Sequence, residues 1–118
     1  MKIYIGYSCT VSVDEFKEIL DVDPNHPRMS RFRRAFGSSY IRPGDFEIYR
    51  RSAAGGEFSP AIIKLLMPFD PGDLDLFGMD LSRARAVFYI RDEREWTARE
   101  ALGITVTDTI DIAKFDYQ

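Results

Sequence analysis

The chain has 118 residues, 45% of them hydrophobic, with nine Phe and six Tyr, which is enough to bury the core of one domain over residues 1–118 and argues against disorder. Its 16 basic and 19 acidic residues give a net charge of −3, unlike the strongly basic balance of proteins that coat DNA. No run approaches the roughly 18 apolar residues of a membrane helix, so we expect a soluble cytoplasmic protein.

Residues 2–7 are rich in Ile and Tyr and alternate, which predicts a strand with its isoleucines on one side and Tyr4 on the other. Ser12 and Glu15 have the spacing of a capping box, in which the Ser12 hydroxyl accepts from the Glu15 amide and the Glu15 carboxylate reaches back to the Ser12 amide. A helix is therefore expected over 13–20, with three apolar side chains on one face.

A second short helix is expected over 30–36, because its apolar stripe ends at Gly37, a residue type typical of helix C-terminal caps. After a proline–glycine turn, the alternation over 46–51 predicts a strand. A short buried helix is expected over 61–67, since Ser and Pro stand at its start and Pro follows it. Residues 68–78 are rich in Asp, Gly and Pro and predict a loop with one turn of helix.

The most apolar strand is expected over 86–90, inside a sheet. A charged turn is predicted over 92–95, and a helical turn over 96–102 that a glycine ends. Residues 104–109 and 110–115 both predict strands whose aliphatic side chains lie on like faces. The sum is a single α+β domain without repeats, in which a mostly antiparallel sheet has short helices packed on one face.

Residue types that commonly carry chemistry are sparse. The chain has one cysteine, Cys9, and one histidine, His26, which rules out an internal disulfide and the usual zinc motifs and favours a reducing compartment. Cys9 is expected to be a small buried side chain or an inert loop thiol, and a Cys9–His26 pair stays open. No glycine-rich motif of the kind that cradles phosphates occurs.

Acidic residues raise two enzymatic alternatives. Residues 70–75 resemble a calcium loop but lack the ligand spacing of an EF-hand. Glu57, Glu95 and Glu100 are candidates for the carboxylate pair of a glycoside hydrolase, yet nothing in the sequence fixes their separation. The simpler interpretation is that these carboxylates solvate turns, so we expect no catalytic, cofactor-binding or metal-binding residues.

Charge is unevenly distributed along the chain: residues 28–51 are basic, and the stretch from Asp70 onward is acidic. Such a distribution presents electric fields that steer partners, so binding is favoured over chemistry. The basic candidates for partner contact are Arg31, Arg33, Arg34, Arg50 and Arg51. The candidates in the acidic half are Asp70, Asp73, Asp75, Asp92, Glu93, Glu95 and Trp96.

Each group has alternatives. The arginines can pair with the protein's own acidic half, contact a protein partner, or bind phosphates while Tyr40 and Tyr49 stack on bases. Trp96 is either an interface anchor, as tryptophan often is, or a core residue. The carboxylates either solvate loops or attract a basic partner, as those of nuclease inhibitors do.

Several short motifs follow one another along the chain. They are IYIGY at 3–7, SVDEF at 12–16, SRFRRAFG at 30–37, DFE at 45–47 and ARAVFYI at 84–90, with a helix ending in Leu65-Leu66 before the last of them. This layout resembles the small bacterial immunity proteins of polymorphic toxin systems, specifically the immunity protein 22 family. The likeness covers residues 3–91, and the chain departs from it in its arginine-rich middle helix and its longer tail.

The resemblance implies a cytoplasmic inhibitor that binds a cognate toxin domain, needs no cofactor and has no catalytic residues. The leading hypothesis is therefore a non-enzymatic protein that neutralises a bacterial toxin, such as a nuclease, by occluding it. The alternative is a small adaptor or regulatory module that binds nucleic acid or protein through its arginines. A third hypothesis is a small enzyme that uses the carboxylates, with or without a metal. We expect a protein partner rather than a membrane.

Overall fold

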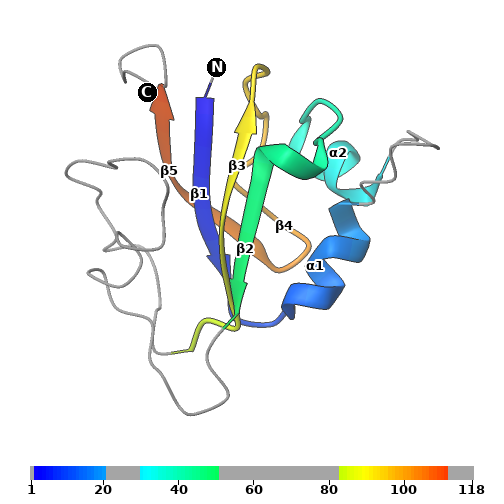
Figure 1. The fold of residues 1–118 in the computed structure, drawn as a ribbon, viewed down its shortest axis with the longest axis vertical. Helices are drawn as coiled ribbons and strands as arrows, with labels where there is room; N and C mark the ends of the chain where they lie inside the picture. Colours follow the sequence, from blue (N-terminus) through cyan, green and yellow to red (C-terminus); the bar gives the residue numbers. More distant parts are fainter. Residues whose placement is uncertain (1, 21–29, 51–82, 112–118) are drawn as a thin grey trace.

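The computed structural model describes residues 2–20, 30–50 and 83–111 (Figure 1). Their elements, in chain order, are β1 (Lys2–Ser8), α1 (Val13–Leu20), α2 (Arg31–Phe36), the 3-10 turn η1 (Pro43–Asp45), β2 (Phe46–Arg50), β3 (Ala86–Asp92), β4 (Glu100–Ala101) and β5 (Ile104–Asp111). The α+β class expected from the sequence is confirmed. The expectations for 61–67 and 68–78 lie outside the described residues.

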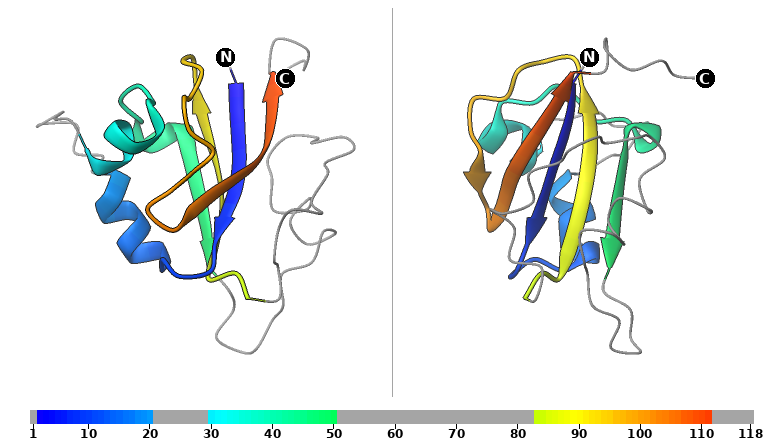
Figure 2. Two further views of the ribbon diagram at one scale, coloured as in Figure 1. Left: turned by 180° about the vertical axis from the view of Figure 1, so that it is seen from behind. Right: turned by 90° about the vertical axis from the view of Figure 1, so that its left-hand side faces the viewer.

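The strands of the described ranges form one sheet in the order β2-β3-β1-β5-β4, and every neighbouring pair is antiparallel. β1 lies in the middle, between β3 and β5 (Figure 2). Its register places Tyr4 opposite Ile90 of β3, and Ile3 opposite Ile110 of β5. β3 is an interior strand, as its apolar sequence predicts.

The helix α1 begins at a capping box and presents one apolar face to the sheet. The Glu15 amide donates to the Ser12 hydroxyl oxygen at 3.2 Å, as the spacing predicts. The Glu15 carboxylate accepts from the Ser12 hydroxyl at 3.0 Å, whereas the expected contact was with the Ser12 amide. Phe16, Ile19 and Leu20 are buried, which confirms the predicted face.

The helix α2 is capped at both ends, and the sequence predicts the cap at its C-terminal end. The Arg33 amide donates to the Ser30 hydroxyl oxygen at 3.1 Å. At the other end, Gly37 adopts φ 72° and its N–H donates to the Arg33 carbonyl at 2.9 Å, an αL cap that disfavours any side chain. A Cβ at Gly37 would lie 2.7 Å from the Thr97 Oγ1 atom, so the glycine also lets the chain after β3 approach α2.

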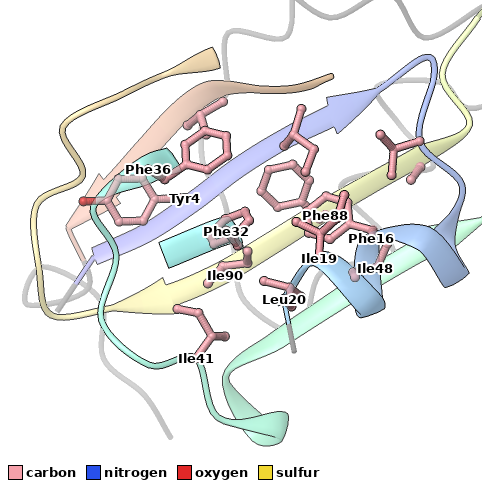
Figure 3. Packing of buried hydrophobic residues seen from close by; sticks show 14 of the residues in the cluster. Tyr4, Phe16, Ile19, Leu20, Phe32, Phe36, Ile41, Ile48, Phe88 and Ile90 are labelled. Atoms are coloured by element: carbon pink, nitrogen blue, oxygen red, sulfur yellow. The ribbon is translucent and has the colours of Figure 1, made fainter. Parts of the chain in front are cut away.

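The core lies between the two helices and one face of the sheet and is rich in aromatic rings (Figure 3). The Phe16 ring lies 4.9 Å from that of Phe88, and the Phe32 ring lies 4.6 Å from Phe36 and 5.2 Å from Trp96, measured between centroids. Such pairs add about 0.5–1.5 kcal/mol each beyond the burial of their area. The core thus ties α1, α2 and β3 to the segment that follows β3.

The second face of the sheet is buried as well. Ile3 and Ile5 of β1 and Val87 of β3 are each 0% exposed, and none of them belongs to the cluster under the helices. Tyr4 belongs to that cluster, so the predicted division of β1 between its isoleucines and Tyr4 is confirmed.

The helical turn predicted over 96–102 is wrong. Residues 96–99 are irregular, and β4 pairs with β5 as a hairpin, with Ala101 opposite Ile104. Leu102 and Gly103 turn the chain with φ 57° and 78°, and two consecutive positive φ values are typical of the tight turns of hairpins. Gly103, which was expected to end a helix, is the second of these turn residues.

The residues predicted as two strands, 104–109 and 110–115, form one strand over the described residues, because β5 runs without interruption from Ile104 to Asp111. The prediction that their aliphatic side chains lie on like faces is wrong. The β1–β5 register shifts between Ile5 and Gly6 of β1. A bulge of this kind moves the side chains that follow it to the other face. Val106 therefore packs in the helix-side core, whereas Ile110 pairs with Ile3 on the opposite face.

We expect the stability of the protein to depend on pH through Tyr49 of β2. The pKa of Tyr49 is raised from 10.0 to about 12. Burial is the largest cause, and the nearby Tyr89 and Glu47 raise the pKa further. Between these two values the folded state keeps a proton that the unfolded state loses, so the free energy of unfolding falls as the pH rises through this window. When urea unfolding is measured at about pH 9 and at about pH 11, the free energy of unfolding should fall less between the two for Tyr49→Phe than for the parent. Equal losses would show that Tyr49 has no such role.

Candidate interaction surface: a braced loop with two exposed glutamates

The loop 93–99, between β3 and β4, combines exposed charged side chains with a backbone that hydrogen bonds hold. The loop leaves the sheet at Asp92, whose carboxylate is only 3% exposed. Its Oδ2 atom accepts from the Ser39 amide at 3.0 Å and from the Trp96 Nε1–H at 2.7 Å. Its Oδ1 atom accepts from the Arg94 amide at 3.2 Å and from the Ser39 hydroxyl. Four donors thus surround this buried carboxylate.

Tyr4 braces the same loop from the central strand. Its hydroxyl donates to the Arg94 carbonyl at 2.9 Å and accepts from the Trp96 amide at 3.0 Å. The Tyr4 and Trp96 rings are stacked, with their centroids 3.9 Å apart and their planes within 4°. A buried tyrosine hydroxyl normally needs a partner, and here the loop backbone supplies two.

The loop is also bonded to α2 and to β5. The Thr97 amide donates to the carbonyl of Phe36, the last residue of α2, at 2.9 Å. The Val106 amide of β5 donates to the Arg99 carbonyl at 2.8 Å. Because the loop backbone is bonded to Asp92, Tyr4, α2 and β5, its conformation is set by the folded core.

The side chains between these bonds point outward. Glu93, Arg94 and Glu95 are exposed, whereas Asp92 and Trp96 on either side of them are buried. The Glu95 carboxylate is 80% exposed and lies 3.5 Å from the Lys2 ammonium. An exposed pair of this kind contributes little stability. The loop therefore presents two carboxylates on a backbone that requires no further ordering on binding.

A cleft of about 350 Å³ adjoins this loop, with Ser39, Tyr40, Arg42, Asp45, Arg91, Asp92 and Glu93 around it. The Tyr40 hydroxyl oxygen is buried and has no hydrogen-bond partner among the residues that the structure describes. An unsatisfied buried polar group costs about 1–3 kcal/mol.

The residues predicted from the acidic half are found in three different settings. Glu93 and Glu95 are exposed on the loop. Trp96 is a core residue, 7% exposed, which is the second of its two predicted alternatives, and the Asp92 carboxylate is enclosed by its hydrogen bonds. These two residues therefore support the loop from beneath. Three further candidates, Asp70, Asp73 and Asp75, lie outside the described residues.

The predicted arginines do not form one surface. Arg31 and Arg34 are exposed on α2, and the Arg33 side chain is half-buried, with an Nε atom that has no hydrogen-bond partner in the described ranges. Arg50 lies at the far end of β2, where its Nη2 atom is 3.3 Å from the Asp14 carboxylate of α1. Arg51 is outside the described residues.

Sequence reasoning missed the residues that build the site from a distance. Ser39 precedes Asp92 by 53 positions, and Tyr4 precedes Trp96 by 92. Neither shows a local signal for its role, since a serine in a loop and a tyrosine in a strand are ordinary. The sequence did draw attention to Tyr40, as an aromatic residue close to the arginines, and Tyr40 lines the cleft beside the loop.

Comparison with known proteins gives no relative: no family model, no curated protein and no solved structure matches this chain. Of the two described helices, α1 has eight residues and α2 has six, and neither could cross a membrane. Within residues 2–20, 30–50 and 83–111, no three His, Cys, Asp or Glu side chains gather in a group able to hold a metal ion.

Proposed function

We propose that this protein is a non-enzymatic immunity protein that binds a cognate bacterial toxin domain and neutralises it by occlusion. The resemblance of its motifs to the immunity protein 22 family supports the proposal. The observation that carries it is the loop after β3, where Glu93 and Glu95 are exposed on a backbone that the buried Asp92 and Tyr4 hold. A prearranged loop binds with little loss of conformational entropy.

Glu93 and Glu95 favour a basic partner at this loop, in which Arg94 and Arg99 bring the net charge of residues 93–99 to zero. Enzymes that bind nucleic acids carry basic surfaces for the phosphates, and exposed carboxylates attract such surfaces from a distance. A nuclease domain is therefore the toxin class that best matches Glu93 and Glu95. The loop would cover the phosphate-binding surface, and an interface of about 1,600 Å² in total is the usual size for a stable complex.

The cleft beside the loop offers an anchor point for a basic side chain of the toxin. Asp45 and Glu93 line the cleft with carboxylates, beside the arginines Arg42 and Arg91. A lysine or arginine that enters would form charge-assisted bonds with the carboxylates. Arg42, which also lines the cleft, would repel a partner with basic residues on every side, which adds specificity.

The first functional prediction concerns the double replacement Glu93→Lys with Glu95→Lys. It should slow association with the toxin domain encoded by the adjacent gene by about tenfold or more at low salt, because it reverses the field that steers the encounter. Surface plasmon resonance of the co-expressed partner measures this rate. Glu18→Lys with Glu47→Lys, which reverses two exposed carboxylates elsewhere, is the matched control and should change the rate much less.

Two results would remove the proposal. One is an isolated gene with no toxin neighbour, whose tagged product purifies alone from its own bacterium. The other is a complex with the neighbouring toxin in which both double variants bind equally fast, because the loop would then play no part in recognition. A partner captured through the loop and lost in the Glu93–Glu95 variant supports both the function and the surface.

A second candidate function rests on the arginines of α2. Arg31 and Arg34 are exposed, and exposed arginines can bind the phosphates of a nucleic acid in an adaptor or regulatory module. Retention on single-stranded RNA that weakens with rising salt, and that Arg31→Gln with Arg34→Gln abolishes, would favour this function. No retention above background at physiological salt would remove it.

A further inference from the structure

A second cleft, of about 310 Å³, lies at the other end of β3 from the loop 93–99, with Ser12, Val13, Asp14, Arg50, Arg83, Ala84 and Arg85 around it. Arg85 immediately precedes β3, whereas Glu93 immediately follows it. Across the seven residues of this strand, the eight steps from Arg85 to Glu93 span about 26 Å at about 3.3 Å per residue. The two clefts are therefore distinct sites.

The charge of this second cleft is positive. Three of its side chains are arginines and one, Asp14, is a carboxylate, so the lining has an excess of positive charge. The Arg50–Asp14 ion pair joins side chains that are 65% and 79% exposed, and pairs so open to solvent are weak. The Arg50 guanidinium can therefore leave Asp14 for a stronger anion at little cost.

Arg85 is held in place, and Arg83 is exposed beside it. The Arg85 Nη1 atom donates to the Thr10 carbonyl at 2.9 Å, which orients one edge of the guanidinium. Both side chains are exposed on the short segment before β3. Guanidinium groups offer paired N–H donors that match the oxygens of a phosphate.

The start of α1 contributes to the same cleft. Val13 and Asp14 line it and are the first two residues of the eight-residue helix. The first N–H groups of a helix have no acceptor within the helix and lie at the positive end of its dipole. The capping box satisfies the Glu15 amide through Ser12, whereas the amides of Val13 and Asp14 precede it in the first turn, where the helix itself offers no acceptor.

We infer that this cleft binds the phosphate group of a small phosphorylated ligand. Three arginines and a helix start offer more donors than a single carboxylate can use, so they match better an anion with several oxygens, such as a phosphate. The volume of about 310 Å³ exceeds that of one phosphate and lies at the lower end of the range for small-ligand sites. The site goes beyond the proposed function, because it needs neither the loop 93–99 nor a toxin.

The test is a titration of the ¹⁵N-labelled protein with pyrophosphate, followed by NMR. The amide signals of Val13 and Asp14 should shift with a saturable dependence. Arg83→Gln with Arg85→Gln should weaken binding by about tenfold or more, since it removes two charged donors to the phosphate oxygens. Asp14→Asn should strengthen binding severalfold, because it frees Arg50 and removes the negative charge of the lining.

The control is Arg31→Gln with Arg34→Gln, which removes the same charge from α2 and should leave the affinity unchanged. Arg83→Gln alone keeps the Arg85–Thr10 bond, so it guards against misfolding of the double variant. Absence of saturable shifts, equal weakening in the α2 control, or weaker binding by Asp14→Asn would overturn the inference. Parallel titrations with adenosine diphosphate and a short single-stranded RNA identify the source of the phosphate. Binding of either that depends on Arg83 and Arg85 supports the site.

Discussion

Replacing Asp92 by asparagine is expected to lower the free energy of unfolding by about 3 kcal/mol, because hydrogen bonds to a buried charged group contribute roughly 1.5–3 kcal/mol each. An amide in this position keeps one acceptor and turns the other into a donor. In either orientation of the amide, its NH2 group faces donors: the Trp96 and Ser39 N–H groups in one, the Arg94 N–H group in the other. At least one of these donors would then be buried without a partner.

Urea denaturation of Asp92→Asn measures this loss. The matched control is Glu93→Gln, which removes the same charge one position later, where the side chain is exposed. It should change the stability by less than about 0.5 kcal/mol. A loss in Asp92→Asn as small as that in the control would mean that the carboxylate does not organise the loop. Binding of the proposed toxin partner should fall with the stability of the loop, although Asp92 itself is buried.

Gly6→Ala should destabilise the protein by at least about 3 kcal/mol, at the upper end of what overpacking of a core costs. A Cβ at this position would lie 2.0 Å from the Thr105 carbonyl oxygen and 2.7 Å from the Phe88 ring. The ring could turn, but the carbonyl belongs to the backbone of β5, the strand paired with β1. The central strand and its neighbour would have to separate.

Gly44→Ala is the control for that substitution, because a Cβ there meets nothing within 4 Å. It should stay within about 0.5 kcal/mol of the parent. Thermal unfolding followed by circular dichroism compares the two variants directly. If Gly6→Ala and Gly44→Ala unfold at the same temperature, β1 and β5 do not pair in the register described above.

Elements with local signals could be predicted from the sequence. The helix α1 follows from Ser12 and Glu15, and the end of α2 from Gly37, because caps act within three or four residues of the chain. The alternation in β1 gave the right faces, since the period of two is a property of a single strand.

Features that depend on pairing between distant strands could not be predicted. The bulge beside Gly6 shifts Ile110 to the other face of the sheet, and no local pattern marks it. The sequence of segment 96–102 favours a helical turn, but β4 forms there because Ala101 pairs with Ile104 across a tight turn. Leu102 at φ 57° is especially hard to foresee, because leucine rarely adopts the left-handed region.

The sequence predicted the charged side chains of the candidate site but not the buried contacts that hold them. The sequence drew attention to Glu93 and Glu95, which the structure places on the surface. It could not separate them from Asp92 and Trp96, their neighbours, because burial there depends on Tyr4 at the other end of the chain. Similarly, the grouping of the arginines along the sequence concealed that Arg50 lies beside α1, with Arg83 and Arg85.

The central claim is that buried contacts fix the loop after β3 and so present Glu93 and Glu95 in one arrangement. The most direct test is ¹⁵N relaxation of the free protein. The amides of residues 93–97 should have order parameters of about 0.85, equal to those of the strands. Values below about 0.6 for these amides would mean that the loop is flexible, and would contradict the account.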